Sequence, residues 1–183
     1  MPHALLIIDI QNDYFAGGAM QLVGSEEAGD VAAGILAEFR SRELPVVNVQ
    51  HIATGAGATF FRPGTTGAEI HASVAPAPGE PVIVKHFPNA FRETELLETL
   101  RAIDCTELVV VGMMTHMCID TTVRAANDLG FKVTLVEDAC ATKDLNHNGR
   151  TTAAAEVQTA YMAAIDDSFA TVVSSHDLLQ SWN

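Results

Sequence analysis

Short runs of apolar and often β-branched residues recur along the chain, with enough sequence between them for helices. The runs occupy residues 4–8, 45–49, 81–84, 107–111, 132–136 and 170–173. Each run is continuous rather than alternating, which is typical of strands that are buried on both faces. Strands that alternate with helices form βαβ units, so the pattern predicts an α/β fold with a mainly parallel sheet and right-handed crossovers.

Helical patterns fill the intervals between these runs. Ser25 is expected to cap the first helix, and Thr94 the second. Further helices are predicted over residues 119–129, 151–165 and 176–181. The longest region without a regular pattern is 51–79, with a short helix near residues 68–73. Because a loop of this length inside a compact domain is usually functional, we expect it near a binding site.

Length and composition narrow the classes of protein. A chain of 183 residues suits a single domain over residues 1–183. The net charge of −13 would repel phosphate backbones and anionic lipids, which argues against nucleic-acid and membrane partners. Three cysteines do not suggest a disulfide framework, and the first apolar run ends too early, at Asp9, for a secretion signal. We therefore expect a cytoplasmic protein.

Chemically active side chains follow several of the predicted strands. Asp9 follows the first strand, His51 closely follows the second, Lys85 ends the third, and His116 and Cys118 follow the fourth. In open parallel sheets, ligands bind beyond the carboxyl ends of the strands. A carboxylate, an amine and a thiol are therefore expected to converge at one edge of the sheet.

Cys118 is the candidate nucleophile of this group. It lies just before a predicted helix, where the helix dipole and the charge of Lys85 would lower the pKa of the thiol. Asp9 could accept the thiol proton and later activate water. Taken alone, Cys118 could be a small buried hydrophobic residue, and Asp9 and Lys85 could form a structural ion pair. The coincidence of all three at strand ends favours the catalytic interpretation.

Aromatic residues in or near the same loops could form a substrate pocket. They are Tyr14, Phe15, Phe60, Phe61, Phe87 and Phe91. For each of them the alternative is ordinary core packing. His51 and His116 are candidate substrate contacts, although His116 could instead shape its own loop.

Several segments resemble one family of enzymes. They are residues 5–15 (LLIIDIQNDYF), 84–91 (VKHFPNAF), 110–122 (VVGMMTHMCIDTT) and 137–142 (EDACAT). In combination they resemble the isochorismatase-like cysteine hydrolases, which include nicotinamidases, N-carbamoylsarcosine amidases and streptothricin hydrolases. The similarity spans nearly the whole chain.

The resemblance implies a three-layer αβα sandwich around a six-stranded parallel sheet. It also implies a catalytic triad at Asp9, Lys85 and Cys118, which would cleave an amide-type C–N bond of a small molecule through a thioester. A cis peptide at Met113–Met114 would direct the amides of Met114 and Cys118 into an oxyanion hole. Family members are commonly dimers or tetramers, so a homodimer or homotetramer is expected.

Two departures from the family refine these expectations. Nicotinamidases carry a metal-binding Asp-x-His after the second strand, whereas residues 48–51 (NVQH) offer His51 without that aspartate. His71 is a possible second ligand, but a third is missing, so we predict no metal and no cofactor. The isochorismate-cleaving members lack the cysteine, so Cys118 argues against vinyl-ether cleavage. Cleavage of another bond type and a catalytically idle binding scaffold remain alternatives.

Overall fold

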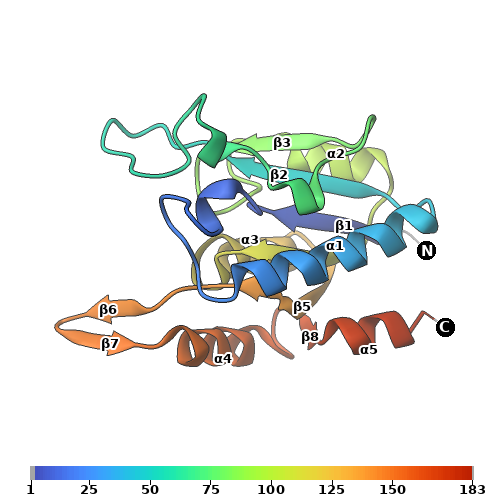
Figure 1. Ribbon diagram of the computed structural model, residues 1–183. Helices are drawn as coiled ribbons and strands as arrows, with labels where there is room; N and C mark the ends of the chain where they lie inside the picture. Colours follow the sequence, from blue (N-terminus) through green and yellow to red (C-terminus); the bar gives the residue numbers. More distant parts are fainter. Residues whose placement is uncertain (1–2, 183) are drawn as a thin grey trace.

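The computed structural model describes residues 3–182 and contains a parallel sheet between two layers of helices (Figure 1). The strand order is β3-β2-β1-β4-β5-β8, and all neighbouring strands are parallel. The strands are β1 (His3–Ile8), β2 (Val46–His51), β3 (Val82–Lys85), β4 (Glu107–Met113), β5 (Lys132–Ala141) and β8 (Thr171–Val173). The six-stranded sheet and the three-layer α/β architecture predicted from the sequence are confirmed.

Helices cover both faces of the sheet. Helices α1 (Ser25–Ser41) and α5 (Ser175–Gln180) share a core with Leu5 and Ile7 of β1. The opposite core contains Leu6 and Ile8 together with α2 (Leu96–Ala102), α3 (Asp120–Asp128) and α4 (Ala154–Ile165). Successive strand residues point to opposite faces, and both faces of β1 are buried. This explains why the central strands are continuous apolar runs rather than alternating ones. The edge strand β3 differs from the prediction, because Val82 and Val84 on one of its faces are exposed.

A hairpin of two short strands was not expected from the sequence. Strand β6 (Leu145–His147) pairs antiparallel with β7 (Arg150–Thr152), which overlaps the predicted start of the fourth helix at residue 151. The turn residues Asn148 and Gly149 both have positive φ, at 48° and 74°, as a two-residue hairpin turn requires. Helix α4 therefore begins at Ala154, whose N–H donates to Asp144 Oδ1 at 2.8 Å.

Some helix boundaries also differ from the prediction. Ser25 lies inside α1, and the residue before it, Gly24, occupies the cap position in a left-handed conformation. In the long loop, the single helix expected near residues 68–73 is replaced by two 3₁₀ turns, Thr66–Ala68 and Ala72–Val74. Glu95, and not Thr94, occupies the cap position of α2, although Thr94 Oγ1 accepts a hydrogen bond of 3.3 Å from the N–H of Leu96.

Close contact between the ends of β1 and β4 shapes one edge of the sheet. Gly112 has φ 138°, and a Cβ placed there would lie 2.0 Å from the carbonyl oxygen of Ile8. Only glycine allows this approach. Asp9 leaves β1 with φ 52°, a left-handed conformation that aspartate tolerates better than most residues. These two backbone positions bring the ends of β1 and β4 together.

Within residues 3–182, none of the helices has the length and apolar character that a membrane span requires.

Candidate active site

The side chain of Lys85 is the centre of a buried polar cluster at this edge of the sheet. Its Nζ lies 2.7 Å from Asp9 Oδ2 and 3.2 Å from Cys118 Sγ. It also lies 2.9 Å from His51 Nδ1 and 3.1 Å from the carbonyl oxygen of Phe87. The strand ends therefore bring the carboxylate, the amine and the thiol together, as the sequence predicted.

Asp9 and Lys85 form a fully buried ion pair, with side-chain exposures of 0% for both residues. Burial raises the pKa of Asp9, and the charge of Lys85 offsets this only in part. Burial lowers the pKa of Lys85, but the neighbouring Asp9 and Cys118 outweigh it and raise the pKa above its ordinary value. Lys85 is therefore a stable cation, and Asp9 is a carboxylate with an increased affinity for a proton.

The thiol of Cys118 is not activated in the way the sequence suggested. Burial raises its pKa, the charge of Asp9 raises it further, and Lys85 lowers it only in part. Cys118 lies within a π-helical turn, Thr115–Ile119, rather than at the first residue of α3, and it is only 5% exposed. The expected lowering of the pKa is therefore wrong. In the free protein the thiol is neutral and needs a base, and Asp9 is the carboxylate beside it.

A buried glutamine that the sequence analysis did not single out holds the end of β2. Gln11 Nε2 donates to the carbonyl oxygens of His51, at 2.9 Å, and Ala68, at 2.8 Å. Its Oε1 accepts from the N–H of His51 at 2.7 Å. This side chain connects the segment after β1 to the end of β2 and to the long loop. The available signal was a polar amide two residues after Asp9, just beyond the first apolar run.

Some of the predicted pocket aromatics gather beside His51. Phe61 has ring-centroid distances of 5.8 Å to His51, 4.6 Å to Tyr14 and 4.9 Å to Phe60. The backbone N–H of Phe61 donates to Asp13 Oδ2 at 2.6 Å, which anchors this part of the loop. The long loop therefore contributes an aromatic wall next to the cluster.

Other predicted pocket residues lie elsewhere or make different contacts. Phe15 stacks on His71 at 3.7 Å, in the core beneath α1. Phe91 packs against Phe131 at 6.0 Å, in the opposite core. For these two residues the alternative of core packing describes the structure. The ring of Phe87 lies under the Arg92 guanidinium, at 3.6 Å, while its carbonyl oxygen accepts from Lys85.

The loop around Cys118 is tied to β5 and α4. His116 Nδ1 lies 2.6 Å from Thr142 Oγ1, and its ring meets Tyr161 edge-on. Thr115 Oγ1 is 2.6 Å from Gln158 Oε1. The peptide bond between Met113 and Met114 is cis. These contacts define the shape of the loop that carries Cys118, which matches the alternative role considered for His116.

The cluster also contains donor atoms of the kind that bind metals. Among residues 3–182, the only group of three close His, Cys, Asp or Glu donors is Asp9, His51 and Cys118, whose atoms lie within 4.8 Å of one another. All three also contact Lys85 Nζ, at 2.7–3.2 Å. A divalent ion bound by these atoms would lie against a buried ammonium group, and like charges repel strongly at such distances. These residues therefore do not fit a metal ion, because Lys85 Nζ occupies the space between their donor atoms.

Comparison with known proteins gives a consistent assignment. The family model for the Isochorismatase domain matches residues 3–177. The isochorismatase family protein YddQ of Bacillus subtilis strain 168 is 49% identical over 180 residues, covering 98% of this chain and 100% of YddQ. A streptothricin hydrolase of Streptomyces noursei is 37% identical over 142 residues, covering 78% of this chain and 50% of that protein.

A solved structure agrees with these sequence relatives. A crystal structure from Oleispira antarctica, described as an isochorismatase hydrolase, has a TM-score of 0.95 and 48% identity, and the match covers 98% of this chain and 96% of that one. Because the family model spans nearly the whole chain and a full-length relative is 49% identical, this chain belongs to the isochorismatase family of hydrolases.

Proposed function

We propose that this protein is a cysteine hydrolase that cleaves an amide-type C–N bond of a small molecule through a thioester on Cys118. The observation that carries the proposal is the contact of one ammonium, Lys85 Nζ, with both Asp9 Oδ2 and Cys118 Sγ in a buried site. A base, a nucleophile and a cation that stabilises either anion are thus in place together.

The first half of the reaction would form the acyl-enzyme. Asp9 accepts the thiol proton of Cys118, and the thiolate attacks the carbonyl carbon of the substrate. Lys85 stabilises the negative charge as it passes from the carboxylate to the sulfur. We assign the backbone N–H groups of Met114 and Cys118 to the oxyanion. The C–N bond then breaks, and Asp9 returns the proton to the departing nitrogen.

The second half would regenerate the free thiol. Asp9, again ionised, removes a proton from a water molecule, and the resulting hydroxide attacks the thioester carbonyl. The C–S bond breaks, a carboxylic acid leaves, and the thiolate regains its proton from Asp9. The raised pKa of Asp9 suits both roles, since the carboxyl group must gain and lose a proton within one turnover.

The choice of a C–N bond is supported by the relatives. The streptothricin hydrolase of Streptomyces noursei shares 37% identity with 78% of this chain. Cleavage of another bond type by the same thiol, and a binding scaffold without turnover, are the competing functions. A scaffold has no need of a carboxylate and an ammonium beside one thiol, so the contacts of Lys85 Nζ with both Asp9 Oδ2 and Cys118 Sγ favour the enzyme.

The experiment that separates these functions is a screen of small amides, lactams and carbamoyl compounds. Turnover should be accompanied by an acyl adduct on the Cys118 peptide, detected by mass spectrometry after rapid acid quenching. The Cys118→Ala variant should lose both signals, and Cys105→Ala, at another buried thiol, should keep both. Full hydrolysis by Cys118→Ala would refute the proposed mechanism. Absence of turnover and adduct across the whole panel would favour the scaffold.

A further inference from the structure

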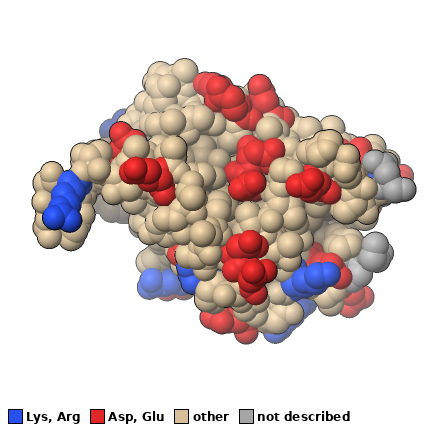
Figure 2. Space-filling model, turned by 90° about the horizontal axis from the view of Figure 1, so that it is seen from below, with Lys and Arg blue, Asp and Glu red and all other residues tan. Residues whose placement is uncertain are grey.

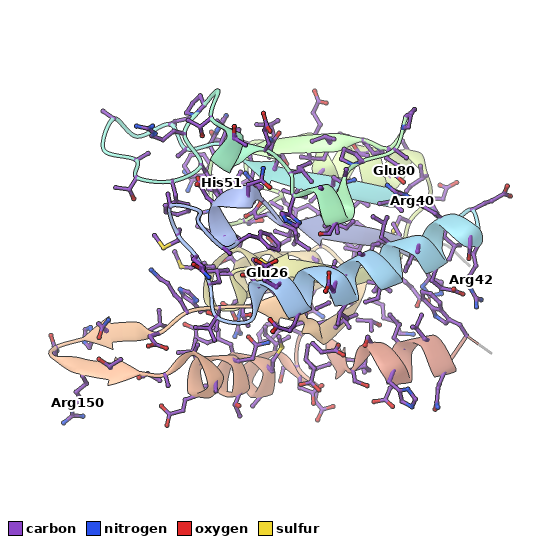
Figure 3. All side chains as sticks on the ribbon, in the orientation of Figure 1. Glu26, Arg40, Arg42, His51, Glu80 and Arg150 are labelled. Atoms are coloured by element: carbon purple, nitrogen blue, oxygen red, sulfur yellow. The ribbon has the colours of Figure 1, made fainter. Side chains whose placement is uncertain are left out.

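His51 belongs to the polar cluster through one ring nitrogen. Its Nδ1 lies 2.9 Å from Lys85 Nζ, and its backbone is held on both sides by the Gln11 side chain. The ring is half-buried and packs near Phe61. Figure 3 shows His51 at the end of β2, where it enters the long loop. The ring is therefore fixed by both backbone and side-chain contacts.

The contact with Lys85 determines the protonation of the imidazole. An ammonium group has only donors, so His51 Nδ1 must accept the hydrogen bond. The ring is then neutral and carries its proton on Nε2. Burial and the nearby charges of Lys85 and His86 lower the pKa of His51 to about 4, which agrees with a neutral ring. The charged and titratable groups facing it are Asp9, Lys85, His86 and Cys118.

The three N–H bonds of Lys85 are matched by three acceptors, His51 Nδ1, the Phe87 carbonyl oxygen and Cys118 Sγ. Asp9 Oδ2 is the ion-pair partner of the ammonium at 2.7 Å and, within the described part of the chain, has no hydrogen-bond partner of its own. His51 and the Phe87 carbonyl stay neutral throughout the proposed reaction. Asp9 and Cys118 exchange a proton, so the negative charge moves between them.

We propose that His51 is a positioning residue for Lys85. Together with the Phe87 carbonyl it fixes two of the N–H bonds, so the third points to Cys118 Sγ while the ammonium stays beside Asp9. The ammonium then stays beside Asp9 and Cys118 while the negative charge moves between them, because the two neutral acceptors keep it in place. The role in catalysis rests on the proposed function, whereas the hydrogen bond and the tautomer do not depend on it.

The hydrogen bond can be tested without a substrate by ¹⁵N NMR of the histidine rings. From pH 5 to pH 8, His51 should show a protonated Nε2 and an unprotonated Nδ1, assigned by loss of its signals in His51→Asn. A protonated Nδ1 in this range would overturn the proposal, since it could not accept from Lys85.

A matched pair of substitutions at His51 tests whether an acceptor at the position of Nδ1 affects the reactivity of Cys118. Asparagine places an amide oxygen near the position of Nδ1, whereas leucine has a similar size and no acceptor. The pH profile of Cys118 alkylation by iodoacetamide, followed on its peptide by mass spectrometry, should shift in His51→Leu and remain close to wild type in His51→Asn. If turnover is found, kcat should fall about tenfold to a hundredfold in His51→Leu with KM nearly unchanged, and His51→Asn should recover most of it.

The outcomes of these experiments separate a failure of the positioning role from a failure of the proposed hydrolase function. Equal alkylation profiles for the leucine and asparagine variants would overturn the positioning role. An increase in KM alone, equal in both variants, would mean that His51 contacts substrate instead, and would also overturn it. The predicted tautomer and alkylation shift, found in a protein without turnover on any substrate, would leave the positioning role standing and count against the hydrolase.

Discussion

Lys85 Nζ lies 3.2 Å from Cys118 Sγ although β3 and β4, which lead to these residues, are separated in the sheet by β2 and β1. The long side chain of Lys85 pairs with Asp9 at the end of β1, and the turn that follows β4 brings Cys118 to the same ammonium. The carboxylate and the ammonium are both removed from water. Each of these two charges therefore depends on the other for its stability in the buried site.

The Asp9–Lys85 pair should show strong energetic coupling. Lys85→Met leaves a buried carboxylate without its cation and should lower the free energy of unfolding by about 3–5 kcal/mol. Asp9→Asn, which keeps the shape and tolerates the left-handed backbone, leaves the ammonium without its anion. The double variant should lose much less than the sum of the two, as measured by urea denaturation. Simple additivity would mean that the two charges do not depend on each other.

The buried thiol of Cys140 predicts a loss of stability at alkaline pH. Burial raises its pKa from 9.0 to about 12. Between these values the unfolded chain has lost a proton that the folded protein keeps, so the free energy of unfolding falls as pH rises. The fall is at most about 1.4 kcal/mol per pH unit from this group. Cys140→Ala should lose stability less steeply above pH 9, measured by urea denaturation at each pH.

An internal control accompanies this pH series. Below pH 8 the thiol of Cys140 is protonated in both states, so the curves of the wild type and Cys140→Ala should run parallel there. Parallel curves above pH 9 as well would show that the thiol ionises equally easily in the folded and the unfolded chain.

Asn48 is a polar residue buried in the core without a visible reason. It is 1% exposed, and neither atom of its side-chain amide has a hydrogen-bond partner among the described residues. Because an unsatisfied buried amide is costly, Asn48→Leu should raise the free energy of unfolding by about 1–3 kcal/mol. The matched substitution Gln11→Leu removes an amide that is fully bonded to His51 and Ala68 and should destabilise the protein. A lower melting temperature for Asn48→Leu would contradict this prediction.

We further propose that the chain forms a homodimer or homotetramer through the face that carries α4. The β6–β7 hairpin extends from the body next to this helix, and Arg150 lies on it (Figures 1 and 3). Figure 2 shows a basic side chain on this projection and many acidic ones on the rest of the same face. On α4, Ala155, Ala160, Ala163 and Ala164 are exposed. A lone hairpin is marginally stable in water, so contact with a second copy would stabilise it.

Light scattering after size-exclusion chromatography measures this association. Ala160→Arg should dissociate the oligomer, because a long charged side chain would enter the contact. Ala102→Arg, at an exposed position of α2, should leave the mass unchanged. A monomeric wild-type protein, or an oligomer indifferent to Ala160→Arg, would exclude this face as the contact.

Most of the fold was predictable because both faces of the sheet are buried. A continuous apolar run such as residues 4–8 is typical of a strand that is covered on each face, so the pattern predicted an α/β fold with a buried parallel sheet. The three-layer arrangement was implied by the family resemblance. The hairpin was missed because strands β6 and β7 bury almost nothing and have no apolar pattern. Its Asn148–Gly149 turn was the one local signal.

The sequence by itself determined which residues reach the edge of the sheet, since Asp9 and Lys85 stand at or next to the ends of buried strands and Cys118 a few residues beyond one. Only the tertiary structure decided their chemistry. Burial depends on every neighbouring element at once, and here it outweighs the nearby cation and keeps the Cys118 thiol neutral. The place of His51 was likewise decided by packing, because the Gln11 side chain, distant in sequence, holds the His51 backbone where the ring contacts Lys85.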